Sequence, residues 1–546
     1  MVALYLSVTG AQPASVAAVE ISAENPALLP SGKEADGIVG DFVLSNENLH
    51  ILVAGNQPMR RANMGTEYLF PTPGSLYDFD LRGEGNDQLT VLRPGQLGGA
   101  LSWVRVAKDG RDGEGVIEAV RTAAKGEGLE VRHEYRLKSG ARTLLISSTY
   151  RNQSRAAKEI NPQPAWKEFS RQWRVGEVRV GDSIDPFDKR AYAWIPSAGS
   201  LPDKVTLAPG EEKSFSLIVA AASSPLAAYG EALSALGKTD RIEGWAKAGT
   251  AGAIHASVLV QVGSEELPLY PDAKGEFAFP LPAGSYKARF TDLGRDEVSK
   301  DLSVAESGTS RLEFSLSAPA SVAFNVRDEQ GRPSACKVQF LGRGATPTPN
   351  LGTDYRAHGA DHQYQSHNGR FTQQVPPGTY LIRISHGPEF DLEEREIMVE
   401  KGRETAVTAT LKRTVDTRGW VSTDYHAHST PSGDNYCSTR DRIINFAGEQ
   451  IEFAPTTEHN RIYDWATQID QLGLSGQLKT IIGGTNRPRP ALQRLSPAAL
   501  TVGARWRRAS MEPRPTHNRD HVARFRRLRS QPVGASQPPA GEPSLQ

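Results

Sequence analysis

Turn-forming residues interrupt every apolar stretch of this chain and limit it to short elements. The 546 residues include 51 glycines and 36 prolines. Between residues 36 and 220, short β-branched or alternating runs lie at 42–44, 49–53, 89–92, 101–106, 115–120, 129–137 and 143–150. Short strands separated at such intervals by Gly, Asn and Asp are typical of a large β-sandwich. The sequence therefore predicts a mainly β protein.

Length and charge narrow the possibilities further. At about 150 residues per domain, the chain has room for three or four domains. Its 63 basic and 63 acidic side chains balance, which gives no reason to expect a polyanion as partner. No apolar run approaches the ~20 residues of a membrane helix, so no membrane span is expected. Two cysteines, Cys336 and Cys437, exclude a disulfide framework and a cysteine-based zinc site.

The first 239 residues divide into a leader and a sandwich. Residues 3–19 are apolar and small, and the first basic residue is Lys33. We expect a leader over 1–35, either the remnant of a signal peptide or a segment without structural role; the first alternative implies a secreted or periplasmic protein. A large β-sandwich is expected over 36–239. Its last strand is expected at 213–221 and a closing helix at 224–239, which begins with Ser and has Gly237 near its end.

A repeat marks the next two domains. Residues 275–290, GEFAFPLPAGSYKARF, align with residues 369–384, GRFTQQVPPGTYLIRI, at a constant offset of 94. The shared Phe, Pro-x-Gly and Tyr predict a hairpin that turns at Pro-x-Gly. The repeat resembles carboxypeptidase-regulatory-like modules of the immunoglobulin type, which we expect at 240–318 and 319–413. The favoured interpretation is that they are spacers without chemistry.

From Thr417 onward the sequence offers metal-ligating side chains. His426 and His428 follow a short strand, and residues two apart on a strand point to the same side. Asp434 follows in a Gly/Ser/Pro loop, a helix is expected at 438–450, and an apolar strand over 451–460 ends in Glu458-His459. Ligands at the carboxyl ends of parallel strands are typical of barrel active sites. A metal site and a set of hydrogen-bonded loop histidines both remain open.

This stretch, DYHAHSTPSGDN followed by IEFAPTTEHNRIYDW, resembles the polymerase-and-histidinol-phosphatase (PHP) superfamily, in its branch of large multidomain, CehA/McbA-like metallohydrolases. The resemblance covers 417–483. It implies a distorted (β/α) barrel holding divalent ions (Zn, Mn or Fe), with His426, His428, Asp434 and His459 as metal ligands. Glu458 stands where the family more often has Asp, and the resemblance implies a catalytic role for it as a proton acceptor. The implied reaction is hydrolysis of a phosphoester or a carboxyl or carbamate-type ester in a small-molecule substrate, by metal-activated water.

The C-terminal part departs from that family. Neither the third-motif Glu nor the later histidines follow LKTIIG at 478–483, and residues 485–546 hold 12 Arg, nine Pro and three acids. A natural basic, disordered tail is one interpretation. When Gly484 onward is reverse-translated and read one base later, however, the string ELTGPALHFNAFPL is allowed at every successive position, and the shifted reading from Met511 allows WNRDPRI. Both strings resemble later PHP motifs. We infer a +1 frameshift at 483–484, natural or from sequencing.

Three functions then compete. The first is a PHP-type metallohydrolase that is inactive or impaired in this chain because later ligands are missing. The second is a non-catalytic β-sandwich binding protein of the cell exterior. The third, a basic-tailed nucleic-acid binder, is disfavoured because the arginines lack a folded scaffold and interleaved aromatics, so no nucleic-acid partner is expected.

Overall fold

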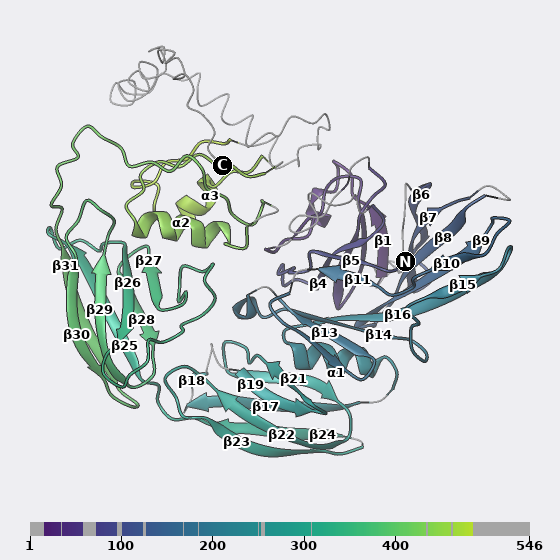
Figure 1. The fold of residues 1–546 in the computed structure, drawn as a ribbon, viewed down its shortest axis with the longest axis horizontal. Coiled ribbons are helices and arrows are strands. Elements are labelled where there is room, and N and C mark those ends of the chain that lie inside the picture. The colour runs from purple at the N-terminus through teal and green to yellow at the C-terminus, as the bar shows by residue number, and fades with distance from the viewer. Residues whose placement is uncertain are drawn as a thin grey trace, which may run out of the picture. The chain divides into compact units, whose positions relative to one another are not determined.

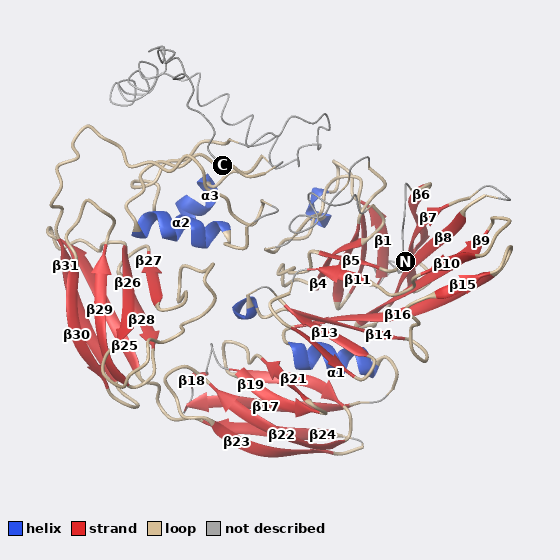
Figure 2. Ribbon diagram, viewed as in Figure 1, coloured by secondary structure: helices blue, strands red, loops and turns tan. Residues whose placement is uncertain are grey.

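The fold was analysed in a computed structural model, and the chain is a mainly β, multidomain protein (Figure 2). The structure describes residues 16–483 except 34, 58–59, 61–72, 96–100, 124–126, 168, 184, 238, 249–250, 253–256, 307, 433–434 and 460–461. Strands separated by turns dominate the described residues up to Leu411, as the density of Gly and Pro predicts. The predicted Arg/Pro-rich tail, 484–546, lies outside the described residues, as do residues 1–15 of the predicted leader.

The first domain is a sandwich of two large sheets (Figure 1). The six-stranded sheet has the order β1-β2-β3-β4-β5-β11, and the eight-stranded sheet has the order β12-β13-β14-β16-β9-β8-β7-β6. A further pair, β10-β15, stands beside them. The strands of the first sheet are β1 (Val16–Glu20), β2 (Phe42–Asn46), β3 (Leu49–Val53), β4 (Leu76–Leu81), β5 (Val91–Arg93) and β11 (Ala165–Lys167). Those of the second are β6 (Trp103–Asp109), β7 (Glu114–Arg121), β8 (Leu129–Lys138), β9 (Thr143–Asn152), β12 (Gln172–Val175), β13 (Val178–Asp182), β14 (Ala191–Pro196) and β16 (Glu212–Ala222), and the extra pair is β10 (Lys158–Ile160) and β15 (Val205–Leu207). Two short 3-10 helices, η1 (Pro26–Leu28) and η2 (Pro186–Asp188), lie in the connections.

The core of this sandwich lies between the two sheets. Fully buried Leu44 and Phe79 of the first sheet share one apolar cluster with Ile117 and Ile146 of the second. Strand β1 falls inside the stretch 1–35 that the sequence assigns to a leader, yet it pairs antiparallel with β2 and buries Val16. Residues 16–20 therefore belong to the sandwich and not to a leader. Composition alone does not distinguish an apolar edge strand from the apolar part of a leader.

One buried carboxyl of the sandwich is unusual. The Asp87 side chain is fully buried, and its Oδ1 accepts hydrogen bonds from the Phe79 N–H (2.7 Å) and the Tyr192 hydroxyl (3.3 Å). Its Oδ2 has no hydrogen-bond partner among the described residues. Burial raises the pKa of Asp87 to about 8, and the neighbouring Asp80 adds to the shift. Burial therefore favours the neutral, protonated form of Asp87 in the folded protein.

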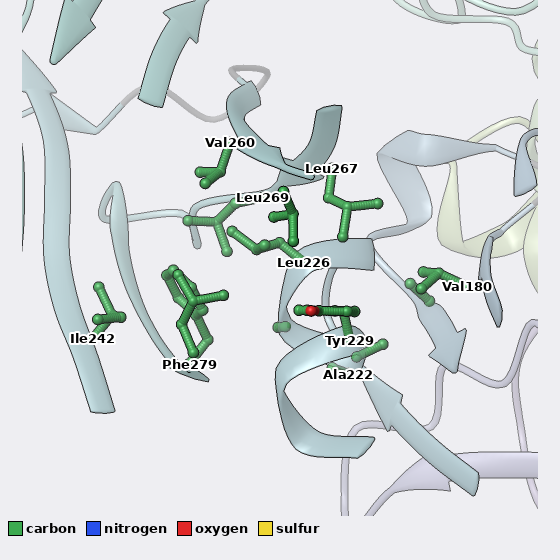
Figure 3. Packing of buried hydrophobic residues seen from close by; sticks show 14 of the residues in the cluster. Val180, Ala222, Leu226, Tyr229, Ile242, Val260, Leu267, Leu269 and Phe279 are labelled. Atoms are coloured by element: carbon green, nitrogen blue, oxygen red, sulfur yellow. The ribbon is translucent and has the colours of Figure 1, made fainter. Parts of the chain in front are cut away.

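Helix α1 (Pro225–Ser234) joins the sandwich to the next domain (Figure 3). Leu226 and Tyr229 of the helix belong to one apolar cluster with Val180 of the eight-stranded sheet and Phe279 of the following domain. The helix lies within the predicted segment 224–239, with Ser224 at its N-cap and Gly237 in the left-handed conformation after its end. The core is thus continuous across residue 240, where the sequence predicts a domain boundary.

The two predicted modules have the same topology. In the first, β20-β19-β22-β23 form one sheet, and β17 pairs with β18 and β21 and, in parallel, with β24. In the second, β27-β26-β29-β30 form one sheet, and β25 pairs with β28 and, in parallel, with β31. The strands of the first are β17 (Asp240–Ala248), β18 (Ala251–Gly252), β19 (Ser257–Val262), β20 (Glu265–Leu269), β21 (Glu276–Leu281), β22 (Gly284–Thr291), β23 (Val298–Val304) and β24 (Thr309–Ser315). Those of the second are β25 (Ser321–Asp328), β26 (Cys336–Gly342), β27 (Gln363–Ser366), β28 (Arg370–Gln374), β29 (Gly378–Ser385), β30 (Glu393–Val399) and β31 (Glu404–Leu411).

The repeated segment forms a corner instead of the predicted hairpin. Strand β21 pairs with β17 while β22 pairs with β19 and β23, so Pro-x-Gly carries the chain from one sheet to the other. The tyrosine explains why the two copies of the repeat have the same spacing. The Tyr286 hydroxyl donates to the Pro282 carbonyl (2.8 Å), and the Tyr380 hydroxyl donates to the Pro376 carbonyl (2.9 Å). The same bond therefore closes the same corner in both modules.

This pair of corners gives a matched test of stability. Removing the hydroxyl in Tyr380→Phe should lower the free energy of unfolding of the second module by about 1 kcal/mol, because one side chain to backbone hydrogen bond is lost while the ring still fills its place. Tyr286→Phe should cost a similar amount in the first module. Urea unfolding followed by circular dichroism measures both. A variant that unfolds at the wild-type urea concentration would show that the corner bond contributes nothing.

The last described part, residues 417–483, contains both remaining helices. These are α2 (Thr439–Gly448) and α3 (Ala466–Gln471). Their buried side chains form a small core in which Ile443 and Phe446 of α2 meet Ile469 of α3 and the fully buried Trp465. This part thus has a small apolar core, which also includes Ala335 of the second module.

Candidate metal centre

Three extended segments of residues 417–483 run side by side in the same direction. Isolated parallel bridges join Thr423 to Phe453 and Phe453 to Lys479. Backbone hydrogen bonds continue the ladder: the Asp424 N–H donates to the Phe453 carbonyl (3.1 Å), and the Thr456 N–H donates to the Ile481 carbonyl (3.0 Å). Helix α2 connects the first segment to the second, and α3 connects the second to the third. This alternation of extended segments and helices is that of parallel β/α units.

Local sequence explains why α2 stands between the first two segments. The Ser438 hydroxyl caps the helix by accepting from the Asp441 N–H (3.0 Å), and the acid in the first turn suits the positive end of the helix. Buried Ile443, Phe446 and Ala447 recur at helical spacing. From the same helix the Arg442 guanidinium donates to the His428 carbonyl (2.9 Å). The helix thus holds the backbone of a predicted ligand.

The structure brings three of the predicted site residues together at the carboxyl ends of the first two segments. The ring centroids of His426 and His428 are 4.9 Å apart, and those of His428 and His459 are 4.6 Å apart. His426 is exposed, whereas His428 and His459 are half-buried. We call these three residues the histidine cluster. Asp434, the fourth predicted ligand, lies outside the described residues.

Glu458 directly precedes His459 in the sequence and is fully buried. Its Oε1 accepts from the Ser429 hydroxyl (2.5 Å) and the Trp465 indole N–H (3.2 Å), and its Oε2 accepts from the Ser432 hydroxyl (2.5 Å) and the Ser429 N–H (3.0 Å). A buried carboxylate satisfied by several donors ties together the chain segments that supply them. The carboxylate therefore joins the two ligand-bearing loops, and its role as a proton acceptor stays a prediction.

Ser432 is the residue that the sequence did not single out. Its hydroxyl contacts the Glu458 carboxylate, the Nδ1 atom of His428 (3.2 Å) and the backbone N–H of His459 (2.9 Å). One hydroxyl thus touches both loops of the histidine cluster and the Glu458 carboxylate. The signal in the sequence is the Ser-rich turn STPS, which begins directly after His428.

The imidazole donors of the histidine cluster are of the right chemical type for a divalent ion, but their present arrangement does not let them share one. Neutral imidazoles are common ligands of Zn²⁺ and of Mn²⁺ or Fe²⁺, and a ligating imidazole usually has a hydrogen-bond partner on its other nitrogen, as His428 does. Within the described ranges, however, no three His, Cys, Asp or Glu side chains are arranged to hold an ion. The rings of His428 and His459 are nearly parallel, at 15°. Because nitrogen lone pairs lie in the ring plane, one ring must turn before both can face one ion.

Among the described residues, no further strand pairs with the first or the third of the parallel segments. The first segment carries Trp420, which is 81% exposed, and Tyr425, which is 52% exposed, while the third carries Ile481, which is 45% exposed. Parallel sheets are normally covered on both faces by other elements of the protein. The described chain ends at Gly483, at the carboxyl end of the third segment, which is where a third group of ligands would stand in a barrel.

Comparisons with known proteins give no further assignment. No protein-family model and no curated protein matches the chain. Among solved structures, it is similar to a TPR-domain containing protein from Parabacteroides distasonis, at 12% identity over 37% of this chain and 53% of that one with a TM-score of 0.23. It is also similar to a polysaccharide lyase, at 12% identity over 50% of this chain and 47% of that one with a TM-score of 0.22. A putative cell adhesion protein from Bacteroides fragilis is 12% identical over 33% of this chain and 95% of its own, with a TM-score of 0.19. These likenesses are partial and carry no inference about function. Along the described residues, no helix combines the length and apolarity that crossing a membrane requires.

Proposed function

We propose that residues 417–483 are the first part of a PHP-type, metal-dependent hydrolase, and that this chain is inactive or impaired because the remaining ligands are missing. The observation that carries the proposal is the gathering of His426, His428 and His459 at the carboxyl ends of two neighbouring parallel segments. The alternation of extended segments with α2 and α3 supports a β/α barrel origin for this part.

The histidine cluster would hold the ion, Zn²⁺, Mn²⁺ or Fe²⁺. A bound divalent ion lowers the pKa of a coordinated water toward neutrality and polarises the ester oxygen under attack. The residues of this chain do the positioning: Glu458 and Ser432 fix the two ligand-bearing loops, and Arg442 holds the His428 carbonyl. The substrate class that this chemistry serves is a small phosphoester or a carboxyl or carbamate-type ester.

The same residues explain why this chain would be a poor enzyme. Three neutral imidazoles suit one ion, whereas a cluster of two ions about 3.5–4 Å apart needs a bridging carboxylate. Glu458 is already engaged by Ser429, Ser432 and Trp465 and cannot bridge without breaking those bonds. We therefore expect weak, mononuclear metal binding from this chain.

Metal binding by the full chain tests the proposal. Zn²⁺ titrated against a competing fluorescent chelator should bind at about one ion per chain, and His428→Ala should weaken this binding by about 100-fold or more, because the central ligand of the histidine cluster is lost. His362→Ala, which removes an imidazole from the second module, should leave binding unchanged. If His428→Ala binds Zn²⁺ as tightly as the wild type, the histidine cluster is not the metal site and the proposal fails.

The second candidate is a non-catalytic β-sandwich binding protein of the cell exterior, secreted or periplasmic. The nearly parallel rings of His428 and His459 favour it, because stacked imidazoles do not share an ion as they stand. A chain that binds no metal in the titration above would support this candidate.

A further inference from the structure

The hydrogen bonds around Ser432 determine which nitrogen of His428 carries the proton. The Ser432 hydroxyl has one proton and two acceptor positions. It lies 2.5 Å from Glu458 Oε2 as donor, and 2.9 Å from the His459 N–H, which can only donate to it. Its remaining neighbour is the His428 Nδ1 atom at 3.2 Å.

Because the only proton of the hydroxyl goes to Glu458, the bond to His428 must run the other way. Further donors to the same carboxylate, the Ser429 hydroxyl and the Trp465 indole, keep Glu458 in the role of acceptor. We infer that Glu458 and Ser432 together hold His428 as the Nδ1–H tautomer, which places the lone pair of the ring on Nε2. Ser432 is a positioning residue, and it acts on the ligand atom through the imidazole ring.

This arrangement has two consequences for the histidine cluster. A neutral histidine in water carries its proton mainly on Nε2, so the Ser432 contact reverses the ordinary preference before any ion arrives. The series of hydrogen bonds from carboxylate to hydroxyl to imidazole also draws the Nδ1 proton away from the ring, which makes Nε2 more basic. The second consequence, stronger metal binding, rests on the proposed function; the tautomer itself does not.

Ser429 supplies a matched control. It also donates a hydroxyl hydrogen bond of 2.5 Å to Glu458, and it is also fully buried, but its other side-chain contact is Thr439 and not a histidine. Ser429→Ala and Ser432→Ala therefore remove the same group from the same carboxylate, and only the second touches His428. Ser432→Thr keeps the hydroxyl and serves as the rescue.

The experiment uses the full chain labelled with ¹⁵N-histidine, without metal and above the pH at which its histidines are charged. Long-range proton–nitrogen spectra report the tautomer of each ring, and His428→Gln identifies the signal of His428. We expect the Nδ1–H pattern for His428 in the wild type, Ser429→Ala and Ser432→Thr, and the Nε2–H or mixed pattern in Ser432→Ala. Unchanged signals of the other histidines show that each variant is folded.

A second measurement separates this inference from the proposed function. In a Zn²⁺ titration, Ser432→Ala should weaken binding by about 10–100-fold, the usual effect of losing an outer partner of a ligating histidine, and Ser429→Ala by less. An Nε2–H pattern in the wild type, or the same pattern in wild type and Ser432→Ala, overturns the inference. If the tautomers behave as expected but no form of the chain binds Zn²⁺, the inference stands and the proposed metal-dependent function fails.

Discussion

Moving the reading frame by one base at Gly484 should convert an impaired chain into a hydrolase. The shifted reading allows a Glu directly after the third parallel segment in the sequence, and then further His and Asp residues. A carboxylate there can bridge two ions, and the added chain can cover the exposed side chains of Tyr425 and Ile481. We expect metal content to rise from about one weakly held ion to two or more, and turnover of aryl phosphates or esters to rise by a factor on the order of 10²–10³ or more.

Three measurements complete this prediction. His426→Ala in the frame-restored protein should remove the activity, since the restored ligands cannot replace a missing imidazole. Reading the DNA around codons 482–486 decides whether the shift is natural or comes from sequencing. Equal turnover by the two forms would show that nothing beyond Gly483 matters to the site, and would contradict our account of it.

The second large effect concerns pH and the buried Asp87 of the first sandwich. The pKa of Asp87 is raised from its ordinary 3.8 to about 8, mainly by burial. Between about pH 4 and pH 8, the folded protein thus keeps on Asp87 a proton that the unfolded chain has already released. The stability that this proton supplies is complete below about pH 4 and is lost as pH rises toward 8, at up to about 1.4 kcal/mol per pH unit. Asp182, whose pKa burial raises to about 7, contributes with the same sign.

Asp87→Asn should remove much of this slope. The amide stays neutral at every pH, and its oxygen can still accept from the Phe79 N–H. Urea unfolding at pH 5, 7 and 9 should show the wild type losing several kcal/mol more than Asp87→Asn, on the order of 3 kcal/mol between pH 5 and pH 9. The control is Asp112→Asn, on the exposed turn between β6 and β7, where the side chain is 64% exposed. Parallel pH profiles for wild type and Asp87→Asn would rule out Asp87 as the source.

The gathering of His426, His428 and His459 could be predicted from sequence because it depends on two local facts. Each ligand follows an apolar extended run, and a helix separates the two runs, so parallel pairing brings their ends together. Ser432 and the engagement of Glu458 could not be predicted. Both depend on which side chains face inward in a turn between His428 and α2, and turn conformation is not set by hydrophobic period.

The fold shows the same division between local and long-range information. Strand positions follow from alternation and turn residues, but which sheet a strand joins does not. The Pro-x-Gly of the repeat predicts a hairpin, and only the pairing of β21 with β17 and of β22 with β19 reveals a corner. Strand β1 is missed for a similar reason, since its partner β2 lies more than twenty residues away along the chain. The mainly β character was predictable because it needs no knowledge of which strands pair.

The parallel pairing of first and last strands gives each module a mechanical property. Strand β17 is joined to β24 over seven residue pairs, from Arg241–Thr309 to Lys247–Ser315, and β25 is joined to β31 over eight, from Ser321–Glu404 to Asp328–Leu411. The chain enters each module along one of these strands and leaves in the same direction along the other. Tension on the two ends therefore slides the strands past one another, and the hydrogen bonds between them share the load instead of opening one after another. Two such modules in series form a tether that resists extension when its two ends are pulled apart.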